Sequence, residues 1–246
     1  MKPITFITVS GLRGGAGTTS LAAMLADVLR CRGEPVLAVD LNPADLLRLH
    51  FGIPYADTKG WAAAQGHPVG WVEQTHVVDR MLQVLPYGRH GSGLAGNTVV
   101  NPDAIWRSLI QDPEGRHYNT RPSWVVFDAP ATPAELTELH KASDLHLLVC
   151  PPDMAAHILL GQYPLEPNTR LLINGVDPGR AANASIVLDW NLRHANRLAP
   201  VHLHHDGHMD EALGHKMTAV MRFPASTVAR SMHRLAVWCL EQRAGP

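Results

Sequence analysis

The chain of 246 residues has few cysteines, no long apolar run and no excess of either charge. Its three cysteines, Cys31, Cys150 and Cys239, are isolated in apolar surroundings, which suits buried thiols in a reducing compartment. No apolar stretch approaches the length needed to span a bilayer, and the first residues, MKPITFITVSG, lack the pattern of a secretory signal. A net charge of −1 with scattered basic residues argues against non-specific nucleic-acid binding. We therefore expect a cytoplasmic protein that touches a membrane only through partners.

Short apolar runs alternate with helix-like segments and begin at Ile4, Val36, Leu82, Trp124, Leu145 and Leu171. Continuous apolar strands indicate burial on both faces, as in a parallel sheet covered by helices. The pattern predicts a doubly wound α/β fold with a mostly parallel sheet, forming a single domain over residues 1–246. Between Tyr55 and Asn119 the pattern is irregular, and we expect long surface connections or an inserted helical pair there.

Three helices have recognisable boundaries, over residues 18–33, 132–142 and 226–242. In the second, Thr132 is the expected N-cap, Pro133 takes the first helical position and Glu135 completes a capping box. The third is amphipathic, and its polar face is not rich in lysine. We therefore expect it to pack on the sheet rather than lie on a membrane.

The stretch SGLRGGAGTTS, residues 10–20, follows the first predicted strand and is built like a phosphate-binding loop. Its glycines at 14, 15 and 17 let backbone N–H groups converge on phosphate oxygens, and the following helix adds partial positive charge at its N-terminus. Thr19 stands where the hydroxyl of such a loop reaches Mg²⁺. The strict pattern G-x-x-x-x-G-K-[ST] is broken twice, by Leu12 at the first glycine and by Thr18 at the lysine.

Two aspartates follow apolar runs of four residues, Asp40 after VLAV and Asp128 after WVVF. Both are expected at the carboxyl edge of the sheet, where doubly wound folds bind ligands. Either aspartate alone is equally well explained as a turn residue or a helix cap. Together with the glycine loop they predict a magnesium-nucleotide site.

The segment RGGAGTTSLAAMLADVLRCRGEPVLAVDLNP resembles the deviant phosphate-loop ATPases of the MinD/ParA group, whose pattern is K-G-G-x-G-K-[ST] followed by D-x-D-P. Both lysines are replaced here. With the later segments DLLRLHFG, GWAAA, LPYG, LLIN and HLHHDGHMDEALGHK, this replacement resembles the BcsQ family of cellulose biosynthesis proteins over nearly the whole chain.

The resemblance implies a set of site residues. Arg13 takes the signature-lysine position, which reaches across a nucleotide-sandwich dimer to the partner's phosphates. Thr19 is implied as a direct Mg²⁺ ligand, Asp40 and Asp128 as water-mediated ones, and Asn174 as the adenine contact. The residues expected around ATP are Arg13, Gly14, Gly15, Ala16, Gly17, Thr18, Thr19, Ser20 and Asn174.

GTP is a second possibility for the nucleotide. The segment NGVD, residues 174–177, has the asparagine and aspartate of a guanine-reading loop. The lysine usual at its second position is Gly175, so we prefer ATP.

Loss of the loop lysine removes a charge-assisted hydrogen bond of about 1.5–3 kcal/mol, or roughly ten- to a hundredfold in affinity. Binding is expected to survive on the remaining backbone donors and Mg²⁺. Hydrolysis should suffer more, because the lysine also stabilises charge that develops on the transferred phosphoryl group. Asn42 also replaces the aspartate that orients the attacking water, so the catalytic candidates Asp40, Asn42 and Arg13 predict slow turnover or none.

The resemblance implies an ATP-binding regulatory subunit of the bacterial cellulose secretion machinery, recruited to the cytoplasmic face of the inner membrane. Its implied partners are a second copy, the small protein BcsR, the component BcsE and the synthase BcsA/BcsB. An active ParA- or MinD-type ATPase that cycles on DNA or membrane is the alternative, although the sequence has no clear basic surface for it. A degenerate scaffold that binds no nucleotide is the third.

Two further groups of residues receive structural interpretations. In HLHHDGH, His202 and His204 would share a face of a strand and zinc can be imagined, but a solvated strand end and loop is preferred. The tryptophans Trp61, Trp71, Trp106 and Trp190 are expected in core or interface packing.

Overall fold

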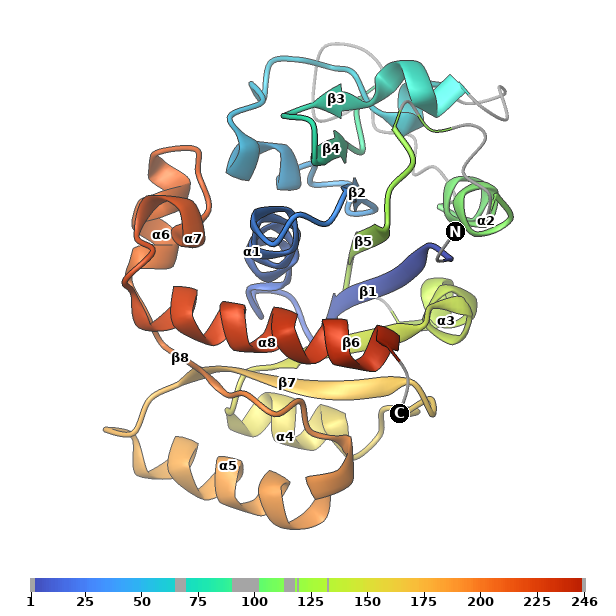
Figure 1. Ribbon diagram of the computed structural model, residues 1–246. Coiled ribbons are helices and arrows are strands. Elements are labelled where there is room, and N and C mark those ends of the chain that lie inside the picture. The colour runs from blue at the N-terminus through green and yellow to red at the C-terminus, as the bar shows by residue number, and fades with distance from the viewer. Residues whose placement is uncertain are drawn as a thin grey trace.

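The computed structural model describes residues 3–64, 70–89, 102–112, 118, 120–131 and 133–244. An eight-stranded sheet in the order β3-β4-β2-β5-β1-β6-β7-β8 runs through the molecule (Figure 1). Its strands are β1 (Thr5–Gly11), β2 (Val36–Asp40), β3 (His76–Val77), β4 (Leu82–Leu85), β5 (Trp124–Ala129), β6 (Leu145–Cys150), β7 (Thr169–Val176) and β8 (Leu203–His204). All neighbouring pairs are parallel except β3 with β4. The predicted doubly wound α/β fold is confirmed.

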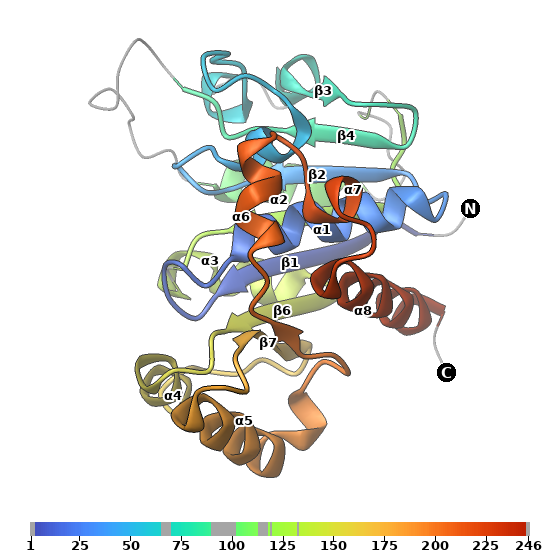
Figure 2. The same cartoon turned by 90° about the vertical axis from the view of Figure 1, so that its left-hand side faces the viewer.

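Helices cover both faces of this sheet. One face carries α1 (Thr18–Cys31), α6 (His208–Gly214), α7 (Ala219–Arg222) and α8 (Thr227–Ala244), and Figure 2 shows α6 and α7 in front of α1. The other face carries α2 (Asp103–Ile110), α3 (Pro133–Ala142), α4 (Met154–Leu160) and α5 (Ala181–Arg193). The third predicted helix therefore packs on the core, as expected.

The continuous apolar strands follow from this two-sided cover. In β2, Val36 and Ala38 belong to the core under α1, whereas Leu37 and Val39 belong to the core under α2 and α3. Successive side chains of a strand point to opposite faces, so a sheet buried on both sides needs an apolar residue at every position.

The irregular part of the chain extends the sheet. Its described residues form 3-10 turns at Trp61–Ala64 and Gly70–Gln74, the strands β3 and β4, and the helix α2. The described residues therefore fit long connections with one helix better than a helical pair. The four tryptophans named above are at most 4% exposed, so their core assignment is confirmed.

Three local expectations have mixed outcomes. Helix α3 begins at Pro133 as predicted, while Thr132 and the side chain of Glu135 lie outside the described residues. Cys150 and Cys239 are buried, but Cys31 is exposed, which corrects the expectation for that thiol. Cys31 is the last residue of α1, where the helix reaches the surface.

Within the described residues, no helix is long and apolar enough to cross a membrane.

Candidate nucleotide and magnesium site

The glycine loop connects the carboxyl end of β1 to the first turn of α1. Gly15 and Gly17 have φ of +73° and +86°, the left-handed region that favours glycine. Gly17 is also the N-cap of α1, and no side chain caps that end. A Cβ at Gly17 would lie 2.7 Å from Nδ2 of Asn174, so only glycine fits. The free backbone donors of α1 therefore open onto the loop, as a phosphate site requires.

Thr18, at the position of the missing lysine, turns back on the start of the loop. Its Oγ1 would lie 2.7 Å from a Cβ built on Gly11, which makes Gly11 a second position where the loop needs glycine. The side chain is short and close to the backbone. It therefore offers nothing in place of the long cationic arm of a lysine.

Asp128 is a buried carboxyl group that is poorly satisfied by the described residues. The residue is fully buried, and neither oxygen has a hydrogen bond of regular geometry among the described residues. Burial raises the pKa of Asp128 to about 7, and the nearby Thr19 hydroxyl acts in the opposite direction. An unsatisfied buried carboxylate is costly, and a bound cation would satisfy it.

Asp40 lies next to Asp128 in the register of β2 and β5, but its contacts are different. Its two carboxylate oxygens accept hydrogen bonds from the backbone N–H groups of Asn42 at 2.8 Å and Leu47 at 3.0 Å. Burial raises the pKa of Asp40 well above its ordinary value, and the neighbouring carboxyl groups of Asp128 and Asp45 raise it further. Asp40 thus organises the segment that follows β2.

Asn42, the predicted counterpart of a water-orienting aspartate, is engaged in its own turn. Its Oδ1 accepts a hydrogen bond of 3.1 Å from the backbone N–H of Ala44. The structure places Asn42 near Asp40 through the backbone, with its amide oxygen used locally.

A buried ion pair that the sequence analysis missed stabilises the following segment. Arg48 is fully buried, with Nε 3.0 Å from Oδ2 of Asp45, and its guanidinium also donates to the carbonyls of Pro54, Asp57 and Lys59. Asp45 has a φ of +55°, which is uncommon for a residue other than glycine. One arginine therefore holds the loop after Phe51 against the end of β2.

Arg13, at the signature-lysine position, pairs with a residue of its own chain. Its Nη2 forms an ion pair with Oδ2 of Asp153, and its Nη1 donates to the carbonyl of Gly14 at 2.9 Å. Asp153 is also the N-cap of α4, because its Oδ1 accepts from the backbone N–H of Ala156 at 2.9 Å. The sequence analysis did not name Asp153, although an aspartate between a proline pair and a helix is a typical N-cap.

Asn174 reaches the loop from β7. Its Nδ2 donates to the carbonyl of Ala16 at 2.8 Å, so the amide holds the loop directly. Ser20, in the first turn of α1, lies 3.3 Å from Nε2 of His50. Burial lowers the pKa of His50 to about 4, so this imidazole is neutral. The predicted loop residues, Asp40, Asp128 and Asn174 thus gather at one edge of the sheet.

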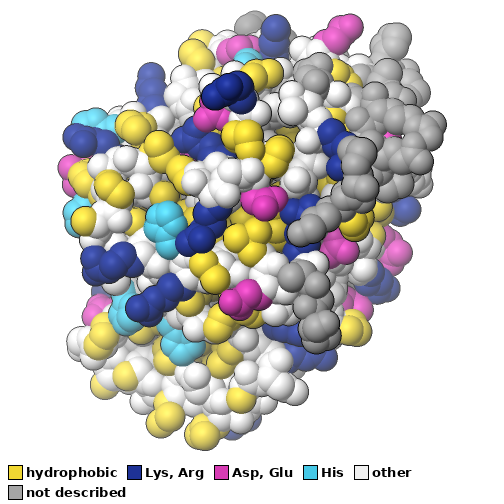
Figure 3. Space-filling view, viewed as in Figure 1, with side chains coloured by type: hydrophobic (Ala, Val, Ile, Leu, Met, Phe, Trp, Pro, Cys, Tyr) yellow, Lys and Arg dark blue, Asp and Glu magenta, His cyan; other side chains and the backbone are white. Residues whose placement is uncertain are grey.

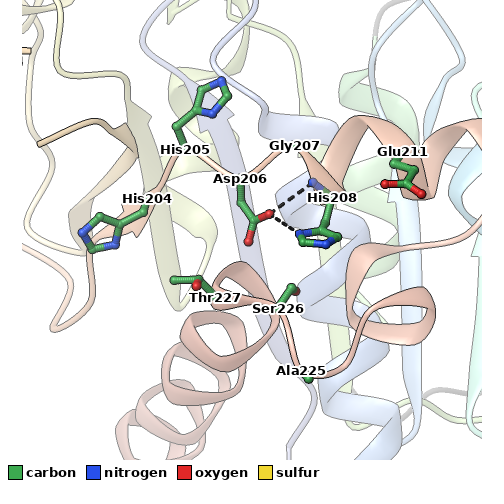
Figure 4. Close-up of a pocket in the computed structure, with 9 residues that line it drawn as sticks. All are labelled: His204, His205, Asp206, Gly207, His208, Glu211, Ala225, Ser226 and Thr227. Atoms are coloured by element: carbon green, nitrogen blue, oxygen red, sulfur yellow. Dashed lines mark hydrogen bonds and ion pairs between the residues drawn. The ribbon is translucent and has the colours of Figure 1, made fainter. Parts of the chain in front are cut away.

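A hollow away from the glycine loop lies between β8 and the start of α8 (Figure 4), lined by His204, His205, Asp206, Gly207, His208, Glu211, Ala225, Ser226 and Thr227. Oδ1 of Asp206 accepts from the backbone N–H of His208 at 3.1 Å and pairs with Nδ1 of the same residue at 2.6 Å. Its Oδ2 accepts from Val228 at the start of α8. The described part of the chain holds no group of three His, Cys, Asp or Glu side chains placed for a metal.

The loop edge has the donor set that a magnesium-nucleotide needs. Glycine-freed N–H groups face it, and the Thr19 hydroxyl and the unsatisfied Asp128 carboxyl supply the oxygen ligands that Mg²⁺ prefers. The residues present therefore fit this cofactor.

Solved structures place the fold in a known class. MinD in the MinC:MinD cell division complex of Aquifex aeolicus has a TM-score of 0.75, with 15% identity and 96% of each chain covered. The septum site-determining protein MinD of Pyrococcus horikoshii, complexed with Mg-ADP, has a TM-score of 0.69, with 18% identity and coverage of 98% and 97%. The fold is that of the MinD/ParA phosphate-loop ATPases.

Sequence comparison is more specific. The family model for cellulose biosynthesis protein BcsQ matches residues 4–240. The BcsQ protein of Escherichia coli K12 is 31% identical over 242 residues, which cover 96% of this chain and 94% of that protein. The chain belongs to the BcsQ family.

Proposed function

We propose that the protein is an ATP-binding assembly subunit of the bacterial cellulose synthase secretion complex, in which Mg²⁺-ATP joins two copies and hydrolysis is weak or absent. The observation that carries the proposal is the unsatisfied, buried carboxyl group of Asp128 beside a glycine loop that lacks its lysine. Membership of the BcsQ family supports the link to cellulose biosynthesis.

The chain would hold the nucleotide mainly with its backbone. N–H groups around Gly15 and Gly17 and the first turn of α1 would bind the phosphates, and Thr19 with Asp128 would hold the metal. Bound Mg²⁺ supplies charge neutralisation between the phosphate oxygens. A related fold that holds Mg-ADP supports this assignment.

Two contacts support slow turnover. Thr18 is uncharged and lies against the start of the loop. Position 18 therefore supplies no cation to stabilise charge on a transferred phosphoryl group. Asn42 uses its amide oxygen within its own turn and carries no negative charge. The site is thus better suited to binding a triphosphate than to cleaving it.

Adenine is the preferred base. Gly175, where a guanine-reading loop carries lysine, has a φ of +82°, a conformation that disfavours lysine. Asp177 stands where a guanine-reading loop carries its aspartate. Its Oδ1 accepts from the backbone N–H of Gly179 at 3.0 Å, and its Oδ2 pairs with Nε of Arg180 at 3.1 Å. Neither residue presents the contacts that select guanine.

The proposed assembly has a nucleotide at a two-fold interface, with Arg13 reaching the phosphates of the second copy. Buried phosphates would then couple association to nucleotide occupancy. BcsR, BcsE and the synthase BcsA/BcsB are the proposed partners at the cytoplasmic face of the inner membrane. Contact with the membrane would go through them.

The test is equilibrium binding of fluorescent ATP and GTP analogues with and without Mg²⁺, combined with sedimentation velocity and phosphate release. We expect saturable, magnesium-dependent binding of the ATP analogue, a nucleotide-dependent dimer and little released phosphate. Absence of binding at millimolar nucleotide would instead identify a scaffold. Steady turnover would identify a cycling ATPase.

A further inference from the structure

Arg13 lies at the proposed dimer edge, but the structure shows its charge neutralised within its own chain. Nη2 pairs with Asp153 and Nη1 with the carbonyl of Gly14, while Nε is buried without a partner. The side chains of Arg13 and Asp153 are 36% and 40% exposed. The pair therefore sits at the surface, where water or a competing anion can reach it.

Asp153 uses its two oxygens for two different tasks. Oδ1 caps α4 through the N–H of Ala156, and Oδ2 holds Arg13. The two residues are 140 positions apart, so the ion pair ties the phosphate loop to the segment that follows β6. The cap anchors the carboxylate, and the carboxylate in turn fixes the direction of the arginine.

We propose that Asp153 is a latch that holds Arg13 in the nucleotide-free chain and releases it when a second copy presents its bound triphosphate. This inference rests on the proposed function. The bonds to Asp153 and Gly14 hold the guanidinium against its own chain, so Arg13 must leave Asp153 before it can reach across to a phosphate of the second copy. Dimer formation therefore requires the ion pair to open in both copies.

The ion pair between Arg13 and Asp153 is weak because both side chains are partly exposed to water. Exposed ion pairs contribute little, and opening one costs about two- to fivefold in an equilibrium constant. A two-fold interface opens two of them, so the dimer is weakened by about four- to twenty-fivefold. The latch therefore raises the protein concentration that is needed for the nucleotide-bound dimer to form.

Asp153→Asn is the sharpest variant, because asparagine keeps the Oδ1 cap of α4 and removes the charge that holds Arg13. With saturating Mg²⁺-ATP, we expect the dimer dissociation constant from sedimentation velocity to fall about four- to twenty-fivefold. Asp153→Glu keeps the charge and is expected to stay within about twofold of the natural chain. Melting temperatures of all variants, without nucleotide, control for damage to α4.

A double-mutant cycle separates a latch from a structural role. In an Arg13→Gln background, Asp153→Asn should leave the dimer dissociation constant unchanged, since no arginine remains to be released. An equal effect in both backgrounds would overturn the latch, as would a weaker or unchanged dimer for Asp153→Asn in the natural background. If the natural chain binds Mg²⁺-ATP but stays monomeric, both the latch and the proposed dimer are wrong, whereas nucleotide binding itself stands.

Discussion

Two pairs of ionisable side chains are buried, one within the sheet and one between β6 and α3, and their members differ in how their polar atoms are satisfied. Asp40 and Asp128 lie side by side at the ends of β2 and β5, and burial raises the pKa of both carboxyl groups. His140 and His146 stack with ring centroids 3.9 Å apart, and burial lowers the pKa of both imidazoles. In each pair, burial favours the uncharged form.

One member of each pair is satisfied by hydrogen bonds: His146 in the histidine pair and Asp40 in the carboxyl pair. Nε2 of His146 lies 2.7 Å from Oγ of Ser10, and its Nδ1 lies 3.0 Å from Oγ1 of Thr169. Nε2 of His140 and both carboxylate oxygens of Asp128 have no hydrogen bond of regular geometry among the described residues. Burial alone therefore does not identify a ligand site in this protein; at Asp128 the poorly satisfied carboxyl group also lies beside the glycine loop and the start of α1.

The contrast within the carboxyl pair predicts the largest effect. Asp40→Ala leaves two backbone N–H groups without a charged acceptor, which should lower the free energy of unfolding by about 4 kcal/mol. Asp128→Ala removes only the contact with the Thr19 hydroxyl and should cost far less. Urea unfolding of the two variants in metal-free buffer at pH 7.5 measures the difference. Equal losses would show that Asp128 is satisfied in the folded chain.

The histidine pair predicts acid sensitivity. The pKa of His140 falls from 6.5 to about 4 on folding, so the unfolded chain takes up its proton first as the pH drops. Stability that is complete above about pH 6.5 should be lost progressively towards pH 4, by about 3 kcal/mol for this group. His140→Phe keeps the ring stack and should remove that share of the loss. Unfolding free energies at pH 7.5 and pH 4.5 for both chains give the test, and an unchanged pH difference would contradict it.

Asp128→Asn tests whether the open carboxyl group holds a metal. We expect the Mg²⁺-dependent part of ATP-analogue binding to weaken about ten- to a hundredfold, because an amide is a poor substitute for a carboxylate near Mg²⁺. Binding without Mg²⁺ should change little. Asn42→Ala is the matched control, since its side chain contacts only its own turn. An equal loss with and without Mg²⁺ would argue for a structural role.

Thr18→Lys tests how much the missing lysine of the glycine loop limits nucleotide binding and hydrolysis. A lysine at this position adds a cation to an edge that has two carboxyl groups, and ATP-analogue affinity should rise about tenfold. Phosphate release should rise as well, although Asn42 still limits it. Thr18→Met, of similar length without charge, is the control. A rise in both variants would point to packing rather than charge.

Sequence reasoning reached the parts of the site that are local in the chain. An apolar strand, a glycine loop and a helix start are contiguous, so residues 10–20 and the two strand-end aspartates could be predicted. The two-residue strands β3 and β8 are too short to leave a periodic signal. Strand β3 was therefore missed, whereas β8 lies where a strand end was expected in HLHHDGH.

The finer assignment could not be read from the sequence. Asp40 and Asp128 follow the same four-residue apolar pattern, and only the positions of the N–H groups of Asn42 and Leu47 distinguish them. The pairing of Arg13 with Asp153 joins residues far apart in the chain. Such contacts depend on the tertiary arrangement of strands and carry no local signature.

The buried Arg48 connects the end of β2, at the candidate nucleotide site, to a surface loop. Arg48 binds the carboxylate of Asp45 and three backbone carbonyls, the last of them that of Lys59. These contacts hold the segment after β2 together. The end of β2 and the surface loop around Asp57 are therefore joined through a single buried side chain, and loss of that side chain would separate them.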